Sequence, residues 1–358
     1  MELRLRNYQP VHTPYPTSAH NLAASTVREV PDEQWDETLQ RLGILDVYYS
    51  RAYVHASTVL EPSEPVLLHY AGANGDVVLP VLIRSIPGRD GLFDAITPYG
   101  YGGPLGAGAA PPLAEFGAAM DTWALQRGVV CSFVRFHPLY SNHHGAPAAI
   151  HTTRLAGTVG WRLDESKDLL ACLHGKHRNV VRKAIAAGVT VTAHEQPDDL
   201  SAFIDMYETT MRRQSAADFY LFPPAYWATL IAPDSPGVVR FDAHLDGTTI
   251  ASALCFASKP WLHYHLGATA AEARSLGASN LVLYEAALWA QARDYTCMHL
   301  GGGVGGADDS LLAFKRRFDP ASPLLECAVG KWIHDADTYE RLSGTRDVSG
   351  FFPAYRTP

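Results

Sequence analysis

The stretch "VVRFDAHLDGTTIASALCFASKPWLHYHLGA" (238–268) constrains the fold more than any other part of this chain. Its three runs are rich in β-branched and aromatic residues, and "LDGTT" and "SKP" between them are typical turn sequences. This pattern predicts three antiparallel strands. Helical patterns precede it at 178–188 and 197–214 and follow it at 278–295, before a further strand at 296–302. We therefore expect a mixed α/β domain in which helices cover an antiparallel meander.

The first half of the chain shows the same order of hairpin, helix and strand. A helix with an acidic start and a Gly stop is expected at 31–43, and a hairpin at 64–86. A helix that opens with Pro and closes with Gly is expected at 110–128, with a strand at 129–138. Because 358 residues are too many for one average domain, the sequence predicts two α/β domains with mixed sheets.

Charge and composition exclude several classes of protein. The net charge is −8, so any contact with RNA must use local positive patches rather than the whole surface. No apolar run is long enough to span a membrane, and the polar, Pro-rich residues 1–28 are expected to form a loose N-terminal arm. The scattered cysteines argue against a zinc site or a disulfide framework and favour a reducing cytoplasm. We interpret these five as buried core thiols: Cys131, Cys172, Cys255, Cys297 and Cys327.

Positive charge is concentrated in "HGKHRNVVRKAIAAGV" (174–189). Lys176, Arg178, Arg182 and Lys183 lie within eight positions, and the two arginines are four apart, so they share one face of the expected helix. This cluster is either a solvated face or a site for a phosphate-rich ligand, which paired guanidinium groups bind bidentately. The apolar residues expected to face inward are Val180, Val181, Ala184 and Ile185.

A glycine-rich segment precedes a second notable group of residues. In "HLGGGVGGADDSLLAFKRRF" (299–318), Gly301, Gly302 and Gly303 allow the backbone to approach a ligand closely. A short helix is expected to follow, with a structural cap from Asp308, Asp309 or Ser310.

Lys315 falls on the apolar face of that short helix, which Leu311, Leu312, Phe314 and Phe318 define. The two arginines that follow it fall outside this face. A partly desolvated lysine has a lowered pKa and can stabilise charge or transfer a proton. The alternative is a lysine whose stem packs while its ammonium group reaches the solvent.

Four tyrosines are candidates for the wall of a binding cleft. Tyr99 and Tyr101 lie among turn-forming residues in "DAITPYGYGGPLG", and Tyr220 lies in the aromatic stretch "DFYLFPPAYW". Tyr264 lies on the last strand of the meander. The alternatives are an ordinary tight connection for the first pair and a hydrophobic helix start for Tyr220.

Two histidines flank Tyr264 on the same strand. Side chains alternate along a strand, so His263 and His265 point to one side and Tyr264 to the other. A pair at this spacing could bind a metal ion, but no carboxylate or third histidine pairs with it in the sequence. We therefore expect no metal.

The segment "EARSLGASNL" (272–281) joins a strand to the N-terminus of a helix, where free N–H groups bind anions. Its pattern is Arg274-x-x-Gly277-x-Ser279. We expect these three residues to contact an anionic ligand.

At these motifs the chain resembles the FemABX-like branch of the GNAT superfamily, the non-ribosomal peptidyltransferases. The resemblance rests on the basic helix, on 261–300, on "DAITPYGYGGPL" and above all on "HLGGGVGG-DDSLLAFKRRF", and covers roughly residues 30–340. It implies two tandem GNAT-like domains that share a cleft. The first would comprise 29–158, completed by 322–345, and the second 159–321.

The resemblance also implies a reaction. In this family an amino acid leaves the 3′ end of an aminoacyl-tRNA and is joined to an amine, and no further cofactor is implied. The lysine of a Phe-Lys pair stabilises the reacting centre, and here this pair is Phe314 and Lys315. The family's arginine-rich helix contacts phosphate, and Arg178 and Arg182 match it.

Some family features differ in this sequence. Gly102-Gly103-Pro104 stands where peptidoglycan-directed members carry Arg-Gly-Pro, and no lysine follows the aromatic residue near Tyr53. Those groups belong to the site for a phosphate-bearing cell-wall precursor, and the long coiled-coil arm of several members is also missing. The differences favour a small amine acceptor, from secondary metabolism or a cell-wall-like precursor.

Two other functions stay open. Arg274-x-x-Gly277-x-Ser279 resembles the R/Q-x-x-G-x-G/A loop with which GNAT enzymes hold the pyrophosphate of acetyl-CoA, except that Ser279 replaces Gly or Ala. This loop favours an acyl-CoA-dependent N-acyltransferase. The third possibility is a GNAT-like protein that binds a ligand without catalysis, against which the presence of Lys315 counts.

Overall fold

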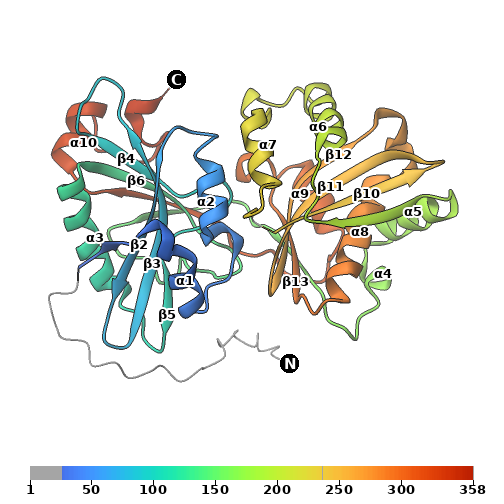
Figure 1. Ribbon diagram of the computed structural model, residues 1–358, viewed down its shortest axis with the longest axis horizontal. Helices are drawn as coiled ribbons and strands as arrows, with labels where there is room; N and C mark the ends of the chain where they lie inside the picture. The colour runs from blue at the N-terminus through green and yellow to red at the C-terminus, as the bar shows by residue number, and fades with distance from the viewer. Residues whose placement is uncertain (1–25, 236, 358) are drawn as a thin grey trace.

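The computed structural model describes residues 26–235 and 237–357, and it contains two mixed sheets side by side (Figure 1). This confirms the expected α/β fold with mixed sheets. Most of the predicted N-terminal arm lies outside the described residues. Its last residue, Arg28, is already in the first sheet, where it pairs with His69.

The first sheet has the strand order β1-β2-β3-β4-β6-β14-β7, with β5 paired to β3. Its strand β14 comes from the C-terminal part of the chain and pairs antiparallel with both β6 and β7. Strand β3 is buried along almost its whole length, as expected for a central strand. The strands are β1 (Arg28–Glu29), β2 (Glu64–Ala71), β3 (Gly75–Ser85), β4 (Phe93–Ile96), β5 (Leu105–Gly108), β6 (Val129–Arg135), β7 (His151–Arg154) and β14 (Ala328–Ile333).

The second sheet has the order β8-β13-β12-β11-β10-β9 and contains the predicted antiparallel meander. The first turn of the meander places Asp246 and Gly247 at positive φ, which suits the right-handed twist of a two-residue hairpin. The strands are β8 (Val159–Arg162), β9 (Thr190–Glu195), β10 (Val238–Leu245), β11 (Thr248–Ser258), β12 (Trp261–Thr269) and β13 (Cys297–Gly301).

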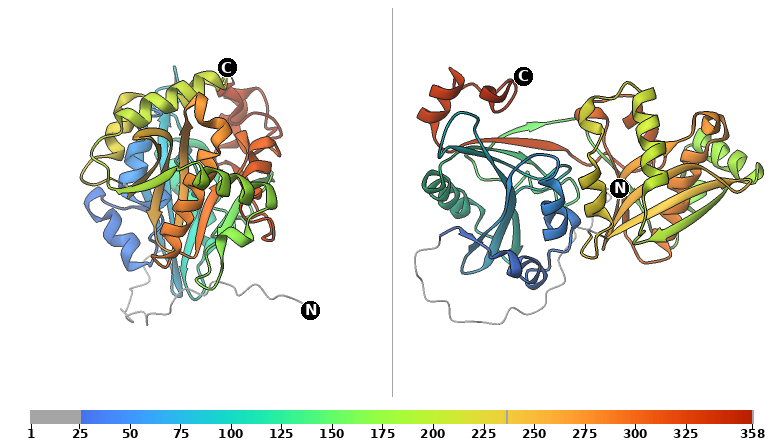
Figure 2. Two further views of the ribbon diagram at one scale, coloured as in Figure 1. Left: turned by 90° about the vertical axis from the view of Figure 1, so that its right-hand side faces the viewer. Right: turned by 45° about the horizontal axis from the view of Figure 1, so that its top comes forward.

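Helices cover both faces of the sheets (Figure 1). Helix α10 lies on the first domain, away from the second (Figure 2, right). Within the described residues, no helix is both long and apolar enough to cross a membrane. The α-helices are α1 (Trp35–Arg41), α2 (Arg51–Ser57), α3 (Leu113–Arg127), α4 (Leu169–Cys172), α5 (Gly175–Ala186), α6 (Ser201–Arg213), α7 (Pro224–Leu230), α8 (Ala278–Gln291), α9 (Ser310–Arg316) and α10 (Ala336–Ser343).

The two domains share one hydrophobic core in addition to their own. The separate cores lie under α3 in the first domain and under α8 in the second. The shared core contains Tyr49 and Tyr53 from the first domain and Tyr207, Tyr226 and Phe256 from the second. Because apolar area removed from water is the main stabilising term, this shared core fixes how the two sheets face each other.

Candidate functional site

A cavity of about 850 Å³ lies between the two domains. Tyr99 and Tyr101 line it from the first domain, and Tyr264 and Lys315 from the second. It opens where β12 and β13 part, because these parallel strands pair over only three residues. The loop that follows α6, with Tyr220, closes another side. The cavity brings together the four predicted tyrosines, the predicted glycines and Lys315.

Lys315 is only 8% exposed, and its Nζ donates a hydrogen bond to the carbonyl oxygen of Gly302 over 2.7 Å. The ammonium also lies 5.8 Å from the centre of the Tyr264 ring. Burial lowers the pKa of Lys315 to about 8, although the negative charge of Asp309 acts in the opposite direction. The group is therefore mainly protonated near neutral pH and can stabilise a developing negative charge.

Asp309 connects the glycine-rich loop to α9. Its carboxylate accepts hydrogen bonds from the backbone N–H groups of Leu312 and Val304, each over 2.9 Å. Asp309 is thus the cap of α9, one of the three residues expected for that role. Leu311 was expected on the buried face but is 38% exposed and lines the cavity, whereas Leu312 of the same face is buried. The buried face of α9 is narrower than expected, because the helix packs on β13 and β8 with Leu312 and Lys315, and with Phe318 just after it.

The glycines leave room for neighbouring side chains and backbone at this site rather than supplying hydrogen-bond donors to it. Gly301 has φ +75°, and a Cβ there would lie 3.4 Å from Lys315 Nζ and 3.5 Å from the hydroxyl oxygen of Tyr101. A Cβ on Gly303 would lie 2.2 Å from the carbonyl oxygen of Ala307. The backbone here is therefore pressed against the lysine, the tyrosine and its own loop.

Tyr101 extends from the first domain toward this loop. Its ring contacts those of Tyr48 and His299, at 5.3 Å and 5.0 Å between centroids. Burial raises the pKa of Tyr101 and of Tyr264, so both phenols keep their protons and can donate hydrogen bonds. Among the described residues that line the cavity there is no aspartate or glutamate, so no carboxylate there can act as a general base.

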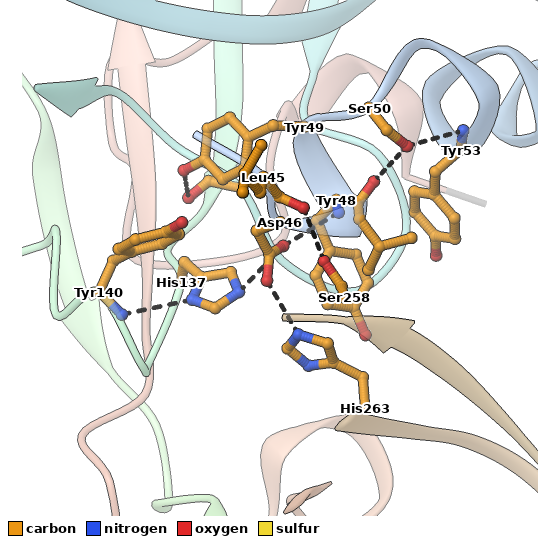
Figure 3. Close-up of polar contacts among 12 residues, drawn as sticks. Leu45, Asp46, Tyr48, Tyr49, Ser50, Tyr53, His137, Tyr140, Ser258 and His263 are labelled. Atoms are coloured by element: carbon orange, nitrogen blue, oxygen red, sulfur yellow. Dashed lines mark hydrogen bonds and ion pairs between the residues drawn. The ribbon is translucent and has the colours of Figure 1, made fainter. Parts of the chain in front are cut away.

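A buried cluster of Asp46, His137 and His263 joins the domains next to this cavity (Figure 3). Asp46 accepts hydrogen bonds from His263 Nε2 over 2.8 Å and from the backbone N–H of Tyr48 over 3.0 Å. His137 Nε2 lies 3.4 Å from the same carboxylate. The backbone N–H of Tyr140 donates to His137 Nδ1, which places the proton of a neutral His137 on Nε2, facing Asp46. The two histidines hold the pKa of Asp46 far below its usual range.

This cluster corrects the expectation that no carboxylate or third histidine pairs with His263. Asp46 and His137 both come from the first domain, and neither is near His263 in the sequence. His265, which was expected on the same side of the strand as His263, instead pairs with the hydroxyl of Tyr226 over 2.8 Å. Burial lowers the pKa of His265 to about 3, so its ring is neutral.

Comparison with known proteins adds a family for part of the chain and a fold for nearly all of it. The family model of the acetyltransferase (GNAT) domain matches residues 174–316. A crystal structure of FemX is similar over 88% of this chain and 99% of its own, with a TM-score of 0.63 and 13% identity. The chain has a FemABX-like tandem GNAT fold.

Two further solved structures are similar to this chain over most of its length. The C-terminal domain of a putative lysylphosphatidylglycerol synthetase from Agrobacterium fabrum matches 84% of this chain and 91% of its own, with a TM-score of 0.54 and 13% identity. A tandem GNAT protein from the clavulanic acid biosynthesis pathway matches 86% and 98%, with a TM-score of 0.50 and 12% identity. The comparison with curated proteins finds no match.

The basic helix of this FemABX-like fold lies outside the cavity lining. On α5, Lys176, Arg182 and Lys183 are exposed. Arg178 donates a hydrogen bond to the carbonyl oxygen of Ala171 over 3.0 Å. The positive face is open to solvent, and a ligand that reaches both this face and Lys315 must extend beyond the cavity.

The inward face of α5 also needs correction. Ile185 was expected to be buried but is 48% exposed, because the buried stripe of α5 consists of His177, Val181 and Ala184. Phe314 does not line the cavity either. Its ring packs at 4.9 Å from that of His177, whose Nε2 donates to the carbonyl oxygen of Phe314 over 3.0 Å. Burial lowers the pKa of His177 to about 4, so the neutral ring supports α9 from behind.

The predicted pyrophosphate loop is partly covered by α5. A Cβ on Gly277 would lie 2.2 Å from a methyl carbon of Val180, so this glycine is pressed against α5. The Ser279 hydroxyl is hydrogen-bonded to Thr269 over 2.6 Å, whereas Arg274 is exposed. None of the three predicted loop residues lines the cavity.

Sequence reasoning missed several residues that line the cavity, among them Arg135 and Cys327. Arg135 is the last residue of β6 and lines the first-domain side of the cavity. The sequence signal that could have identified it is a positive charge at the end of the otherwise apolar strand "VVCSFV". Cys327 also lines the cavity and is only partly buried, which corrects its assignment as a core thiol. Cys172 is likewise only partly buried.

Proposed function

We propose that this protein is an aminoacyl-tRNA-dependent aminoacyltransferase that joins an amino acid to the amine of a small acceptor. The GNAT domain and the tandem fold support an acyltransferase. The observation that carries the proposal is Lys315, a buried ammonium in a cavity that both domains line. A donor would approach from the second domain and an acceptor from the first.

The chemistry needs little from the protein beyond positioning and charge. A neutral amine attacks the carbonyl carbon of the aminoacyl ester, the C–N bond forms, the C–O bond to the terminal ribose breaks, and the ribose hydroxyl leaves. The proton lost by the amine reaches the leaving oxygen through water or a substrate hydroxyl, because the described cavity lining offers no carboxylate. The negative charge on the tetrahedral carbonyl oxygen is stabilised by Lys315 Nζ, with the Tyr101 hydroxyl as a second donor.

The features that place a donor also favour charged tRNA over acyl-CoA. The exposed cations of α5 suit a polyanion that continues past the cavity. The named function of one structural neighbour, lysylphosphatidylglycerol synthetase, is consistent with transfer of an amino acid. Such a substrate would place the protein in the cytoplasm. No bound cofactor is proposed.

An acyl-CoA-dependent N-acyltransferase is the second candidate. It is favoured by exposed Arg274 beside the N-terminus of α8 and by the match to the acetyltransferase domain. Against it, Gly277 is covered by Val180, and the loop does not line the cavity. A protein that binds without catalysis would have no need of a buried, partly desolvated Lys315.

A transfer assay tests the proposal directly. Purified protein is incubated with a pool of tRNA charged with labelled amino acids and a panel of small amines, with and without RNase. The proposal expects labelled amides that disappear with RNase and with Lys315→Met, but persist with Lys259→Met, which removes an exposed lysine. Amides formed from acetyl-CoA in the presence of RNase would establish the second candidate instead.

A further inference from the structure

Arg135 gives the first-domain wall of the cavity a positive charge. It ends β6, and its side chain is one of two cations that line the cavity, the other being Lys315. No aspartate or glutamate occurs among the described lining residues. In a protein with net charge −8, this cavity is therefore locally positive.

The guanidinium of Arg135 forms no ion pair with any carboxylate of the described residues, although the charge of Glu61 acts on it from farther away. One of its terminal nitrogens, Nη1, donates to the carbonyl oxygen of Thr97 over 2.8 Å, and the group lies 5.0 Å from the centre of the Phe133 ring. By contrast, Arg84 in the same sheet pairs with Asp94, over 2.6 Å, and with Glu61. Charges that lose contact with water are normally paired because desolvation is costly. Arg135 is half-buried, and this burial lowers its pKa although the charge of Glu61 acts in the opposite direction.

The contacts of Arg135 leave one edge of its planar guanidinium group available to a ligand. Thr97 accepts the backbone N–H of Arg135 over 2.9 Å with its hydroxyl oxygen and the Nη1 donor with its carbonyl oxygen, so one bond holds the backbone and the other holds the guanidinium. No described residue bonds to Nε or to the second terminal nitrogen. This pair of donors has the spacing of the two oxygens of a carboxylate.

We propose that Arg135 binds a carboxylate of the acceptor, so that the acceptor is an amino acid or a short peptide whose own amine is acylated. This inference rests on the proposed function and specifies its acceptor. The carboxylate is held at the first-domain wall while the amine of the same molecule faces the donor carbonyl at Lys315. A phosphate can use the same two donors, so the binding test compares it directly with a carboxylate.

The test uses matched amines that differ only in the carboxylate, namely L-lysine against cadaverine and L-tyrosine against tyramine. Binding of each probe to the full-length protein without donor is measured by calorimetry, for wild type and Arg135→Gln. The expected result is that the carboxylated member binds more tightly and that Arg135→Gln weakens it by about 10- to 100-fold, with little change for its partner. Arg135→Lys should recover only part of the loss, because an ammonium cannot form the two parallel hydrogen bonds.

The controls separate binding from folding and from the donor. Arg154→Gln removes an exposed arginine of β7 and should leave the binding of all four probes unchanged. Circular dichroism and thermal unfolding should show that Arg135→Gln is folded. In the transfer assay, Arg135→Gln should raise the KM for a carboxylated acceptor while kcat and the KM for the donor stay the same.

Three results would overturn the inference. One is equal binding of the matched probes, another is an equal loss for both members in Arg135→Gln, and the third is tighter binding of phosphoethanolamine than of β-alanine that depends on Arg135. Because the binding experiment contains no donor, it can succeed even if charged tRNA is not the donor. Conversely, tRNA-dependent transfer to amines without a carboxylate preference would refute only this inference.

Discussion

The buried carboxylate of Asp46 should contribute strongly to the attachment of the two domains. It comes from the first domain, is 2% exposed, and accepts the His263 Nε2 proton from β12 of the second. Replacing Asp46 by Asn removes the charge and one of the two acceptor oxygens. The single amide oxygen that remains must then serve three donors: His263, the Tyr48 N–H and His137. Breaking a buried charge pair from one side costs about 3–5 kcal/mol. We therefore expect Asp46→Asn to lower the free energy of unfolding by about 3 kcal/mol.

The chain offers a matched control in Asp32. Asp32 likewise lies between two basic side chains, here Arg51 and His55, but this group is exposed to solvent. Exposed pairs contribute about 0–1 kcal/mol, so Asp32→Asn should change stability by less than about 1 kcal/mol. The same chemical change thus tests burial alone.

The assay is a urea titration at pH 7.5 followed by tryptophan fluorescence. Trp261 stacks on His137, with centroids 5.6 Å apart, and so reports on this interface. Since the folded-state pKa of Asp46 is depressed, its contribution is complete above its unfolded pKa and declines as the pH falls below about 4. If the free energy of unfolding of Asp46→Asn at pH 7.5 were within about 1 kcal/mol of the wild-type value, the conclusion that this cluster joins the domains would be refuted.

Three further predictions concern the cavity. If the ammonium form of Lys315 is required, the ratio of wild-type to Lys315→Arg activity should fall as the pH rises through about 8, and a constant ratio would contradict this role. Gly301→Ala places a methyl group against Lys315 at a residue with positive φ. It should lower kcat about tenfold without abolishing binding of the four amine probes. An unchanged kcat would show that the loop moves to accommodate the methyl group. The folded-state pKa of His265 is about 3, so the unfolded chain binds its proton first as the pH falls below about 6.5. Stability should therefore drop by about 1–2 kcal/mol between pH 7.5 and pH 5, and less in His265→Gln, as thermal unfolding can measure.

Local sequence patterns were sufficient for the helices and strands that the sequence analysis named and for the cap of the helix that carries Lys315. The meander, its Asp246-Gly247 turn and the cap at Asp309 all depend on residues close together in the chain. The exposure of Leu311 depends instead on how α9 packs on β13 and β8. The same holds for Ile185, because only packing decides how wide a buried stripe becomes.

Contacts between the domains were beyond sequence reasoning. His263 and Asp46 are 217 positions apart, and nothing in either segment indicates that they meet. Arg135 looked like the end of an ordinary strand until the second domain completed the cavity around it. Periodicity predicts which face of an element is buried, but not which distant side chain lies opposite.

The most direct test of the account is equilibrium binding of two donor analogues. One is an RNA minihelix ending in a non-hydrolysable 3′-aminoacyl amide, and the other is acetyl-CoA, each measured at about 50 and 200 mM salt. The account predicts binding of the minihelix that weakens steeply with salt as counterions are released, and no binding of acetyl-CoA. Binding of acetyl-CoA alone, or minihelix binding that does not respond to salt, would contradict it.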